Sequence, residues 1–531
     1  MKQSSFRLIE TNGIRLRTVE GNKSVRDFVQ DWCGATTAKT REEVHMAHRL
    51  GHHAVVIGGS LAGLMTARVL SDHFDAVTVL ERDALDAQRG MHHSIPQGHH
   101  LHGLLRGGQQ VMASLYPGFL DTLDALGARR YRAGTELVFY LPTGKAFSAT
   151  GTVREPYDLG FDITCHSRGL LEYCVRQCTL AHPNITLASA SRVQGLLYAD
   201  GRVRGVRIQQ GGEARSLAAD FVVDASGRGS QAPRWLTEFG FHAPAATTIG
   251  VDMAYASTKF RVPATYDAPE RILACLGPAP DFPDGAVMGI IEENLWHVTL
   301  VGRFGHYPPH DAAGFLAFAK ALYTPKIYEL IKDAERVTDI TSYRFPTSVL
   351  RHYERLRTFP EGLVVVGDAI SSFNPFYGQG MSSAALQVEA LQQLLHERAT
   401  ASQGLDGLAQ AFFPQAAAIV LTPWTLAARQ DWAFPRTQGD RPADLEEDAQ
   451  YFAALDALTA DDVEVYRLLV DVFHLVKPLS ALHEEPLRSR VVARQQNQGG
   501  QESTSAAPHR ARWESRHGRA AVPRNLVSAL K

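Results

Sequence analysis

The sequence lacks the features that mark secreted, membrane-spanning or strongly charged proteins. Its 531 residues include five cysteines, an odd number with no Cys-x-x-Cys pair, so a disulfide framework is not expected. The formal net charge is −2, which offers no electrostatic attraction to nucleic acid or to an anionic membrane. No apolar run reaches the about 18 residues of a transmembrane helix, and no signal-peptide core follows Met1. These absences predict a reduced, cytoplasmic protein without a transmembrane segment.

The most informative stretch that is present covers residues 54–64, Ala-Val-Val-Ile-Gly-Gly-Ser-Leu-Ala-Gly-Leu. The four apolar residues predict a buried strand, the glycines a tight turn, and the apolar spacing after them a helix. Such a turn aims backbone N–H groups and the positive helix end at one point, which suits a pyrophosphate. Glu81 follows the next apolar run, about 20 residues on, where a carboxylate accepts from ribose hydroxyls. The predicted contacts are Gly58, Gly59, Ser60, Ala62, Gly63, Glu81 and Arg82.

Ser60 is the one departure from this fingerprint, because it stands where a second glycine lets the backbone approach the phosphates. Serine is the smallest departure, and its hydroxyl is itself able to donate to a phosphate oxygen. Taken alone, the stretch is compatible with a dinucleotide site or with an ordinary strand–turn–helix.

A second signal of the same kind lies far downstream. The apolar run 363–366 ends at Gly367-Asp368, and a glycine-rich loop then opens a long helix. The candidate ligand-contacting residues in this loop and helix start are Pro375, Phe376, Tyr377, Gly378, Gln379, Gly380 and Met381. Two helix starts that attract anions fit a cofactor with two ends. A third strand ends in Asp224-Ala225-Ser226-Gly227, where a ligand is able to touch the backbone.

The remaining segments are less specific. Residues 185–223 predict a meander of short strands. Residues 240–345 predict an antiparallel sheet able to cover an apolar pocket, with Trp296 as a candidate lining residue, although a purely structural sheet would look the same. Ser167 predicts a helix cap, and Arg168 beside it is either a phosphate or flavin contact or a surface ion-pair partner.

Five histidines lie within residues 92–102, a loop rich in glycine and proline. Acidic or cysteine co-ligands are missing nearby, so a packed loop beside a ligand is favoured over a metal site.

Taken in order, these motifs resemble the FAD-dependent monooxygenases of the p-hydroxybenzoate hydroxylase fold. The loop Arg89…Ile95-Pro96-Gln97…His100-x-His102 and the segment Ser167-Arg168…Leu171-Glu172 resemble a bacterial subgroup that includes the lasalocid and monensin polyether epoxidases. The resemblance covers roughly residues 52–430. The sequence departs from the subgroup at Ser60 and at His99, where arginine is common.

The resemblance implies an α/β fold (α+β overall): a Rossmann-like FAD-binding domain, an inserted antiparallel-sheet substrate domain and a helical C-terminal region. The implied divisions are an N-terminal extension (1–50) with a hairpin around Asn12-Gly13, the FAD-binding domain (51–130, 160–238, 346–400), the substrate domain (131–159, 239–345), the helical region (401–487) and a flexible basic tail (488–531).

The resemblance also implies a reaction. FAD would lie with its pyrophosphate at 58–63, its ribose on Glu81 and its flavin end near Asp368 and the helix start at 378–383. A flavin C4a-hydroperoxide would transfer oxygen from O2 to a small apolar or aromatic organic substrate, with Phe376 and Tyr377 as lining residues. NAD(P)H would supply electrons directly or through a partner flavin reductase. No acid or base is assigned, and Ser60→Gly is expected to retain flavin.

Three other functions stay open at this point. One is a flavin-dependent halogenase, although the Trp-x-Trp-x-Ile-Pro string of tryptophan halogenases is absent from the sequence. The second is a flavin reductase of isoprenoid double bonds, since such enzymes share the fold. The third is a non-catalytic flavin-binding protein. Substrate, regiochemistry and oligomeric state leave no trace in the sequence.

Overall fold

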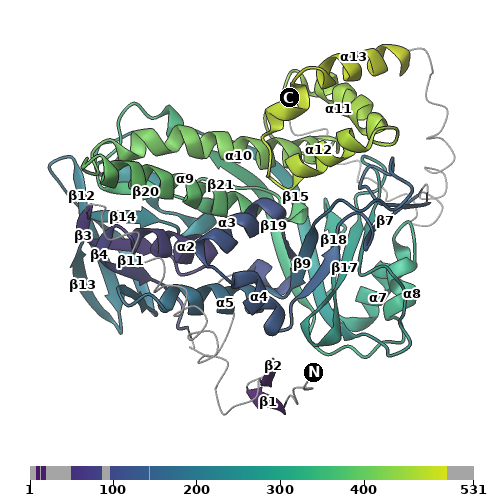
Figure 1. The fold of residues 1–531 in the computed structure, drawn as a ribbon, viewed down its shortest axis with the longest axis horizontal. Helices are drawn as coiled ribbons and strands as arrows, with labels where there is room; N and C mark the ends of the chain where they lie inside the picture. Colours follow the sequence, from purple (N-terminus) through teal and green to yellow (C-terminus); the bar gives the residue numbers. More distant parts are fainter. Residues whose placement is uncertain (1–6, 12–13, 19–48, 86–95, 143, 499–531) are drawn as a thin grey trace, which may run out of the picture.

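The computed structural model describes residues 7–11, 14–18, 49–85, 96–142 and 144–498 (Figure 1). Strands β1 (Arg7–Thr11) and β2 (Ile14–Thr18) pair antiparallel, the hairpin that the Asn-Gly pair predicts. The rest of the N-terminal extension, the first half of the histidine-rich loop and residues 499–531 lie outside the described ranges.

A five-stranded parallel sheet forms the first half of the molecule, in the order β10-β4-β3-β14-β20. Its strands are β3 (Gly51–Ile57), β4 (Phe74–Leu80), β10 (Ile185–Ala188), β14 (Phe221–Asp224) and β20 (Leu363–Val365). The central strands are nearly continuous apolar runs because helices cover the sheet. All five carboxyl ends meet at one edge, so the motifs predicted after residues 57, 80, 224 and 365 are neighbours in space.

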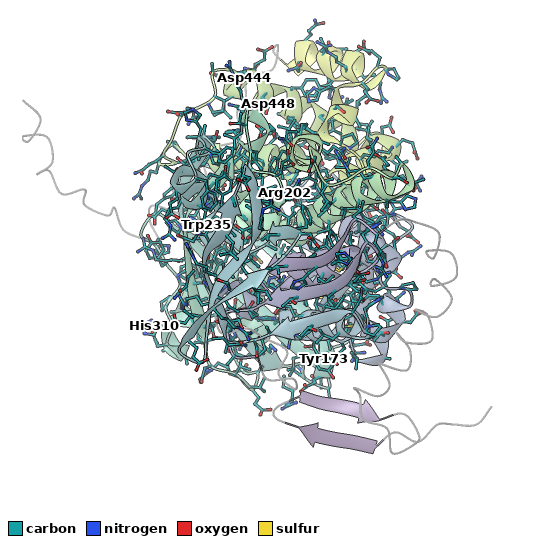
Figure 2. All side chains as sticks on the ribbon, turned by 90° about the vertical axis from the view of Figure 1, so that its left-hand side faces the viewer. Tyr173, Arg202, Trp235, His310, Asp444 and Asp448 are labelled. Carbon is teal, nitrogen blue, oxygen red and sulfur yellow. The ribbon has the colours of Figure 1, made fainter. Side chains whose placement is uncertain are left out.

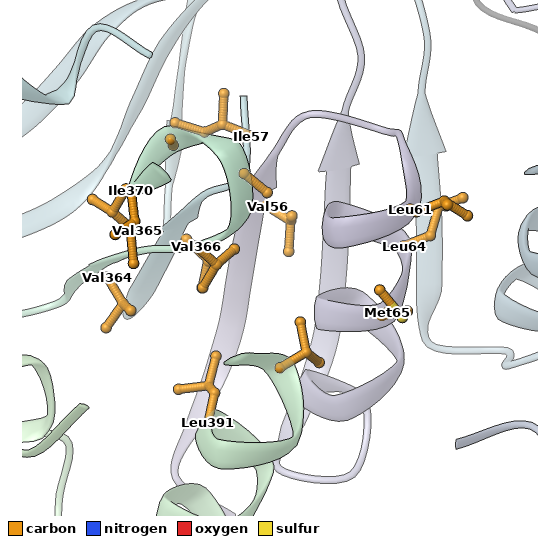
Figure 3. Packing of buried hydrophobic residues seen from close by; sticks show 14 of the residues in the cluster. Val56, Ile57, Leu61, Leu64, Met65, Val364, Val365, Val366, Ile370 and Leu391 are labelled. Carbon is orange, nitrogen blue, oxygen red and sulfur yellow. The ribbon is translucent and has the colours of Figure 1, made fainter. Parts of the chain in front are cut away.

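Helices α2 (Leu61–Leu70) and α9 (Gly380–Thr400) pack together beside this sheet. Figure 3 shows Leu64 and Met65 of α2, Leu391 of α9 and the end of β20 in one core, with Leu61 at the turn that leaves β3. The other helices of this half are α3 (Arg106–Leu115), α4 (Phe119–Ala125), α5 (Arg168–Leu180) and α6 (Ala232–Glu238).

The predicted meander over 185–223 is only partly correct. Strands β11 (Ser191–Ala199), β12 (Arg202–Gln210) and β13 (Glu213–Ala218) form a three-stranded antiparallel sheet. The flanking strands β10 and β14 belong instead to the parallel sheet. A short apolar run in the sequence does not indicate which sheet the strand joins. Strand β13 was not predicted because its side chains are almost all exposed and it therefore has no apolar pattern.

The second half is an eight-stranded sheet in the order β21-β19-β15-β18-β17-β16-β7-β8, antiparallel except for the β16–β7 pair. Its strands are β7 (Leu137–Leu141), β8 (Gly144–Ala146), β15 (Ala246–Arg261), β16 (Ile272–Leu276), β17 (Gly285–Ile291), β18 (Leu295–Arg303), β19 (Thr341–Arg351) and β21 (Ser371–Ser372). Helices α7 (Ala312–Ala321) and α8 (Lys326–Ile331) pack against one face. A small sheet of β5 (His102–Leu104), β9 (Asp162–His166) and β6 (Arg129–Arg132) lies between the halves. This architecture confirms the predicted α/β fold class.

The C-terminal region contains α10 (Leu408–Trp432), α11 (Leu445–Thr459), α12 (Val463–Phe473) and α13 (Leu487–Gln498). Ion pairs join Arg202 of β12 to Asp406, just before α10, and Arg429 of α10 to Asp448 of α11. Figure 2 labels Arg202 and Asp448. Helix α13 continues to residue 498, so the helical region extends past the predicted boundary at 488.

Helix α10 is the one described helix that is long and apolar enough to cross a membrane by length and composition. Half of the apolar stretch of this helix is buried inside the protein, and the helix packs against α9, as the core helix of a folded domain does. Pro414 and Pro423 lie inside it without ending it, although proline removes a backbone N–H donor from the helix.

Candidate functional site

The sequence motifs converge at the carboxyl edge of the parallel sheet, and the glycines show how closely. Gly58 has a φ of +107°, and a Cβ there would lie 2.5 Å from the carbonyl oxygen of Ala225. A Cβ on Gly63 would lie 1.8 Å from the carbonyl oxygen of Gly58. The strand, the turn and the helix therefore touch through backbone atoms, which only glycine permits.

Glu81 fixes this turn from the neighbouring strand. The backbone N–H of Gly59 donates to its Oε2 at 2.8 Å, and the N–H of Asp83 donates to its Oε1 at 2.8 Å. The carboxylate is buried. A carboxylate oxygen has two lone pairs, so each oxygen is able to accept from more than one donor. Arg82 beside it is half-exposed, with its Nε 4.0 Å from Asp83.

Gly367 joins the two helix starts. It has a φ of +68°, and a Cβ there would lie 3.1 Å from Ala62 in the first turn of α2 and 3.8 Å from Ala384 in α9. Neither Ser60 nor Gln379 caps its helix through its side chain. Both helices therefore present uncapped N–H groups beside the same glycine, which is a strong setting for an anion.

Asp368 follows Gly367, and the charges of two arginines act on its carboxyl group. Desolvation raises the pKa of its carboxyl, and the positive charges of Arg168 and Arg228 oppose that rise. Gly227 is close by, since a Cβ there would lie 4.0 Å from the Cβ of Asp368. The predicted Asp224 segment and the predicted Gly367-Asp368 segment are thus parts of one site.

The side chain of Asp224 serves its own loop. Its carboxylate accepts from the backbone N–H and hydroxyl of Ser226, at 2.9 and 2.5 Å, and from the hydroxyl of Ser230 at 2.6 Å. The residue is fully buried. It shapes the loop that carries Gly227 and Arg228, and its role toward a cofactor is through that loop.

Arg168 begins α5, where Ser167 caps the helix as predicted by accepting from the N–H of Leu170 at 3.2 Å. Its guanidinium is buried and pairs with Glu172 at 3.0 Å. The alternative of a surface ion pair is therefore excluded. Glu172 is named in the sequence as part of this segment, but its pairing with Arg168 was not predicted, although a position four residues on is a recognisable helix pairing.

The large sheet faces this site with aromatic side chains. The rings of His100, Tyr255 and Tyr343 lie together, with centroids 5.3 Å apart for His100 and Tyr255 and 6.0 Å apart for His100 and Tyr343. Tyr343 lies in β19, and the carbonyl oxygen of Thr347 in the same strand accepts from Arg228 Nη1 at 2.5 Å, so this strand borders the charged groups of the glycine site. Burial lowers the pKa of His100 to about 3, so its imidazole is neutral. Sequence reasoning did not single out either tyrosine.

A buried network ties the loop before α9 to the sheet. Asp431 of α10 accepts from Arg303 at 2.9 Å and from the Asn374 side chain at 2.8 Å, both through Oδ1. The Tyr377 hydroxyl lies 3.4 Å from the same oxygen, and Tyr255 donates to the Asn374 amide oxygen at 2.9 Å. No motif marks Asp431 in the sequence, because it reaches the site only through the packing of α10.

Trp296 lies on the opposite face of the sheet. Residues alternate along β18, so His297 and Thr299 contact the loop at residues 99–101, at 2.9 Å to the oxygen of His99 and 3.1 Å to the N–H of Leu101. Trp296 packs edge-on against Tyr266 with ring centroids 5.0 Å apart, in the core shared with α7. This position corrects the prediction that Trp296 lines the substrate pocket.

The other predicted residues follow the edge of the site. The short loop and first turn of α9 hold Pro375, Phe376, Tyr377, Gly378, Gln379, Gly380 and Met381. The Gln379 side chain turns away to α12, where its Nε2 donates to the carbonyl oxygen of Phe473 at 2.9 Å. The C-terminal region thus packs directly on the loop that opens α9.

These residues fit FAD. Two uncapped helix starts, a backbone turn that excludes any Cβ, and an arginine buried between them suit a diphosphate with groups extending in both directions. Within the described ranges no three His, Cys, Asp or Glu side chains converge as metal ligands.

Comparisons with known proteins agree with this geometry. A family described as "FAD binding domain" matches residues 109–258. Protein Rv3254 of Mycobacterium tuberculosis is 34% identical over 369 residues, 68% of this chain and 77% of that protein. Kynurenine 3-monooxygenase of Salinispora arenicola is 27% identical over 364 residues, 66% of this chain and 73% of that protein.

Among solved structures, the flavin-dependent brominase Bmp2 superposes with a TM-score of 0.60 at 14% identity, over 85% of this chain and all of that one. At this identity the likeness shows the fold. Together, the site and the relatives show that the chain belongs to the family of Protein Rv3254, within the FAD-dependent monooxygenases, and is a flavin-dependent oxidoreductase.

Proposed function

We propose that the protein inserts one oxygen atom from O2 into an apolar alkene or aromatic substrate, by epoxidation or hydroxylation. The observation that carries the proposal is the convergence of α2 and α9 on Gly367, together with the contact of Arg228 with β19, the strand of the large sheet that carries Tyr343. A redox cofactor held there would have its reactive end next to a wall that attracts flat, apolar molecules.

The residues proposed to hold FAD act mainly through their backbone and charge. They are Gly58, Gly59, Ser60, Ala62, Gly63, Glu81, Arg82, Arg168, Asp224, Gly367, Asp368, Pro375, Gly378, Gln379, Gly380 and Met381. The start of α2 and Arg168 would hold the diphosphate, and Glu81 the ribose. The start of α9 would place positive partial charge beside the flavin ring, which favours its anionic reduced form.

When bound, FAD supplies the two-electron chemistry and the activation of O2. In the balanced reaction, one oxygen atom enters the substrate, the other leaves as water, and NAD(P)H provides two electrons directly or through a partner flavin reductase. The contribution of this chain is to position the substrate and exclude water.

The substrate side is aromatic and largely uncharged. Tyr255 and Tyr343 present rings with centroids 6.4 Å apart, and His100 between them is neutral. We propose Phe376 and Tyr377 as further lining residues, because their short helix directly precedes α9 and its cap, Asn374, accepts from Tyr255. No side chain is assigned as a general acid or base.

Within this class, the motifs favour a bacterial epoxidase of secondary metabolism resembling the polyether epoxidases, acting in the cytoplasm. We also propose that the division into an FAD-binding domain, a substrate domain and a helical region follows the sequence boundaries, with the helical region extended to residue 498.

The test is an assay of purified yellow protein with NADPH, O2 and a panel of apolar alkenes and phenols. Gain of one oxygen atom from ¹⁸O-labelled O2 supports the proposal. A product that depends on chloride or bromide would instead indicate a halogenase, and anaerobic saturation of an alkene a reductase. Tyr343→Leu should change which probes are oxygenated, whereas Trp296→Phe, on the far face of the sheet, should not.

A further inference from the structure

Ser60, Arg168 and Glu172 form a buried cluster where α2 and α5 begin. The Ser60 hydroxyl donates to Glu172 Oε1 at 2.6 Å. Arg168 Nη2 donates to the same serine oxygen at 3.1 Å and to Glu172 Oε1 at 3.0 Å. The side chains of Arg168 and Glu172 are 9% and 1% exposed.

The direction of these hydrogen bonds decides what Ser60 is able to do. A serine hydroxyl has one hydrogen, and here that hydrogen is donated to Glu172. This hydrogen is therefore not available for a phosphate oxygen, which was the role considered for the Ser60 hydroxyl from the sequence. The serine oxygen instead accepts from Arg168, so the residue that replaces the fingerprint glycine connects the start of α2 to a cation.

The cluster also fixes where that cation lies. Glu172 pairs with this guanidinium, and its charge also acts on the buried Arg176, so Glu172 partners two buried cations. A buried charge without such a partner is costly. Arg168 contacts Ser60 just before the start of α2, and its positive charge opposes the rise in the pKa of Asp368, which follows Gly367. An exposed pair at this helix spacing contributes little to stability, but a buried pair held by a third group has one fixed geometry.

We propose that Ser60 and Glu172 are positioning residues that hold the Arg168 guanidinium against the diphosphate of FAD, so that serine at this position is a functional feature of the turn and not a tolerated variant. The inference rests on the proposed binding of FAD, and it does not depend on which substrate is oxygenated.

The inference predicts that restoring the fingerprint weakens binding. Ser60→Gly would let the backbone approach the phosphates but would release Arg168. Ser60→Ala would release it without that gain. We expect both to raise the Kd for FAD about tenfold, equivalent to about 1.4 kcal/mol. Glu172→Gln should do the same, because the amide keeps the shape but not the charge.

The experiment measures Kd by flavin fluorescence on apoprotein, for FAD, for ADP by competition, and for riboflavin, which has no diphosphate. The expected result is weaker binding of FAD and ADP with riboflavin unchanged. In an Arg168→Met background, Ser60→Ala should have no further effect. Ser71→Ala, at the other end of α2, is the matched control and should bind FAD as the wild type does, and thermal unfolding should confirm that each variant is folded.

The outcomes separate the two proposals. If Ser60→Gly binds FAD as tightly as the wild type, or if Ser60→Ala still weakens binding without Arg168, the positioning role is refuted. If the wild type binds FAD and these shifts appear but no probe is oxygenated, the inference stands and the proposed reaction fails. A folded wild-type protein without FAD affinity would refute both.

Discussion

Replacing Arg303 by methionine should destabilise the protein far more than breaking any of its surface ion pairs. Methionine keeps the apolar stem of the arginine but removes its charge. Arg303 and Asp431 are 2.9 Å apart, with side chains 6% and 1% exposed. The substitution leaves the Asp431 carboxylate buried with the Asn374 amide still donating to it and no cation nearby to balance it.

The magnitude follows from this burial. Removing one partner of a buried ion pair costs about 3–5 kcal/mol, because the remaining charge stays desolvated. An unfolding entropy of about 2.1 cal/mol/K per residue gives about 1 °C per kcal/mol for a chain of 531 residues, so the expected fall in Tm is about 3–5 °C. The matched control is Arg261→Met, which breaks the ion pair between Arg261 and Glu335. The side chains of these two residues are 55% and 64% exposed. That change should cost less than about 1 kcal/mol.

A double variant separates charge from packing. In Arg303→Met/Asp431→Asn the amide oxygen still accepts from Asn374, and no uncompensated charge is left. It should recover most of the lost Tm in a thermal unfolding assay at neutral pH. If the double variant is as unstable as Arg303→Met, or if Arg303→Met is no less stable than Arg261→Met, the reasoning from the buried charge is refuted.

Three further outcomes follow from the site. Asp368→Ala should purify largely without FAD, as judged by flavin absorbance, and a fully yellow, active variant would contradict its place in the site. Gly63→Ala should fail to accumulate as folded protein, because its Cβ would lie 1.8 Å from the Gly58 oxygen, and a normal melting curve would argue against that close approach. Burial lowers the pKa of His474 from 6.5 to about 4, and its Nδ1 accepts from the Arg106 N–H at 3.2 Å. As the pH falls, the unfolded chain takes up a proton at this histidine before the folded protein does, so the free energy of unfolding should decrease between about pH 6.5 and about pH 4. The decrease should be about 2 kcal/mol larger than in His474→Asn, and an equal pH dependence of the two proteins in urea unfolding would contradict this.

Much of the cofactor end of the site was predictable from the sequence. The strand at 54–57, the glycine turn after it, and the second strand ending at Gly367 are local patterns whose chemistry depends on backbone shape. Because the carboxyl ends of parallel strands share an edge, these patterns also imply that the turn, Glu81 and Gly367 meet. The structure adds the distances at which these segments meet.

The substrate side was not predictable in the same way. Trp296 is the most conspicuous aromatic residue of its strand, yet it faces α7, because side chains alternate across a sheet and the sequence does not say which face is covered. Tyr255 and Tyr343 become a wall only when two strands far apart in sequence are paired, in the register that aligns them.

The sequence by itself therefore determined the cofactor, because a diphosphate is held by backbone turns and helix starts that local residues encode. Only the tertiary structure decided what the polar side chains do. Ser60 donates to Glu172 and not toward a ligand, and Asp431 reaches the site from a helix beyond the predicted FAD-binding domain. Such partners are set by the packing of distant helices, and a single sequence carries no local signal for them.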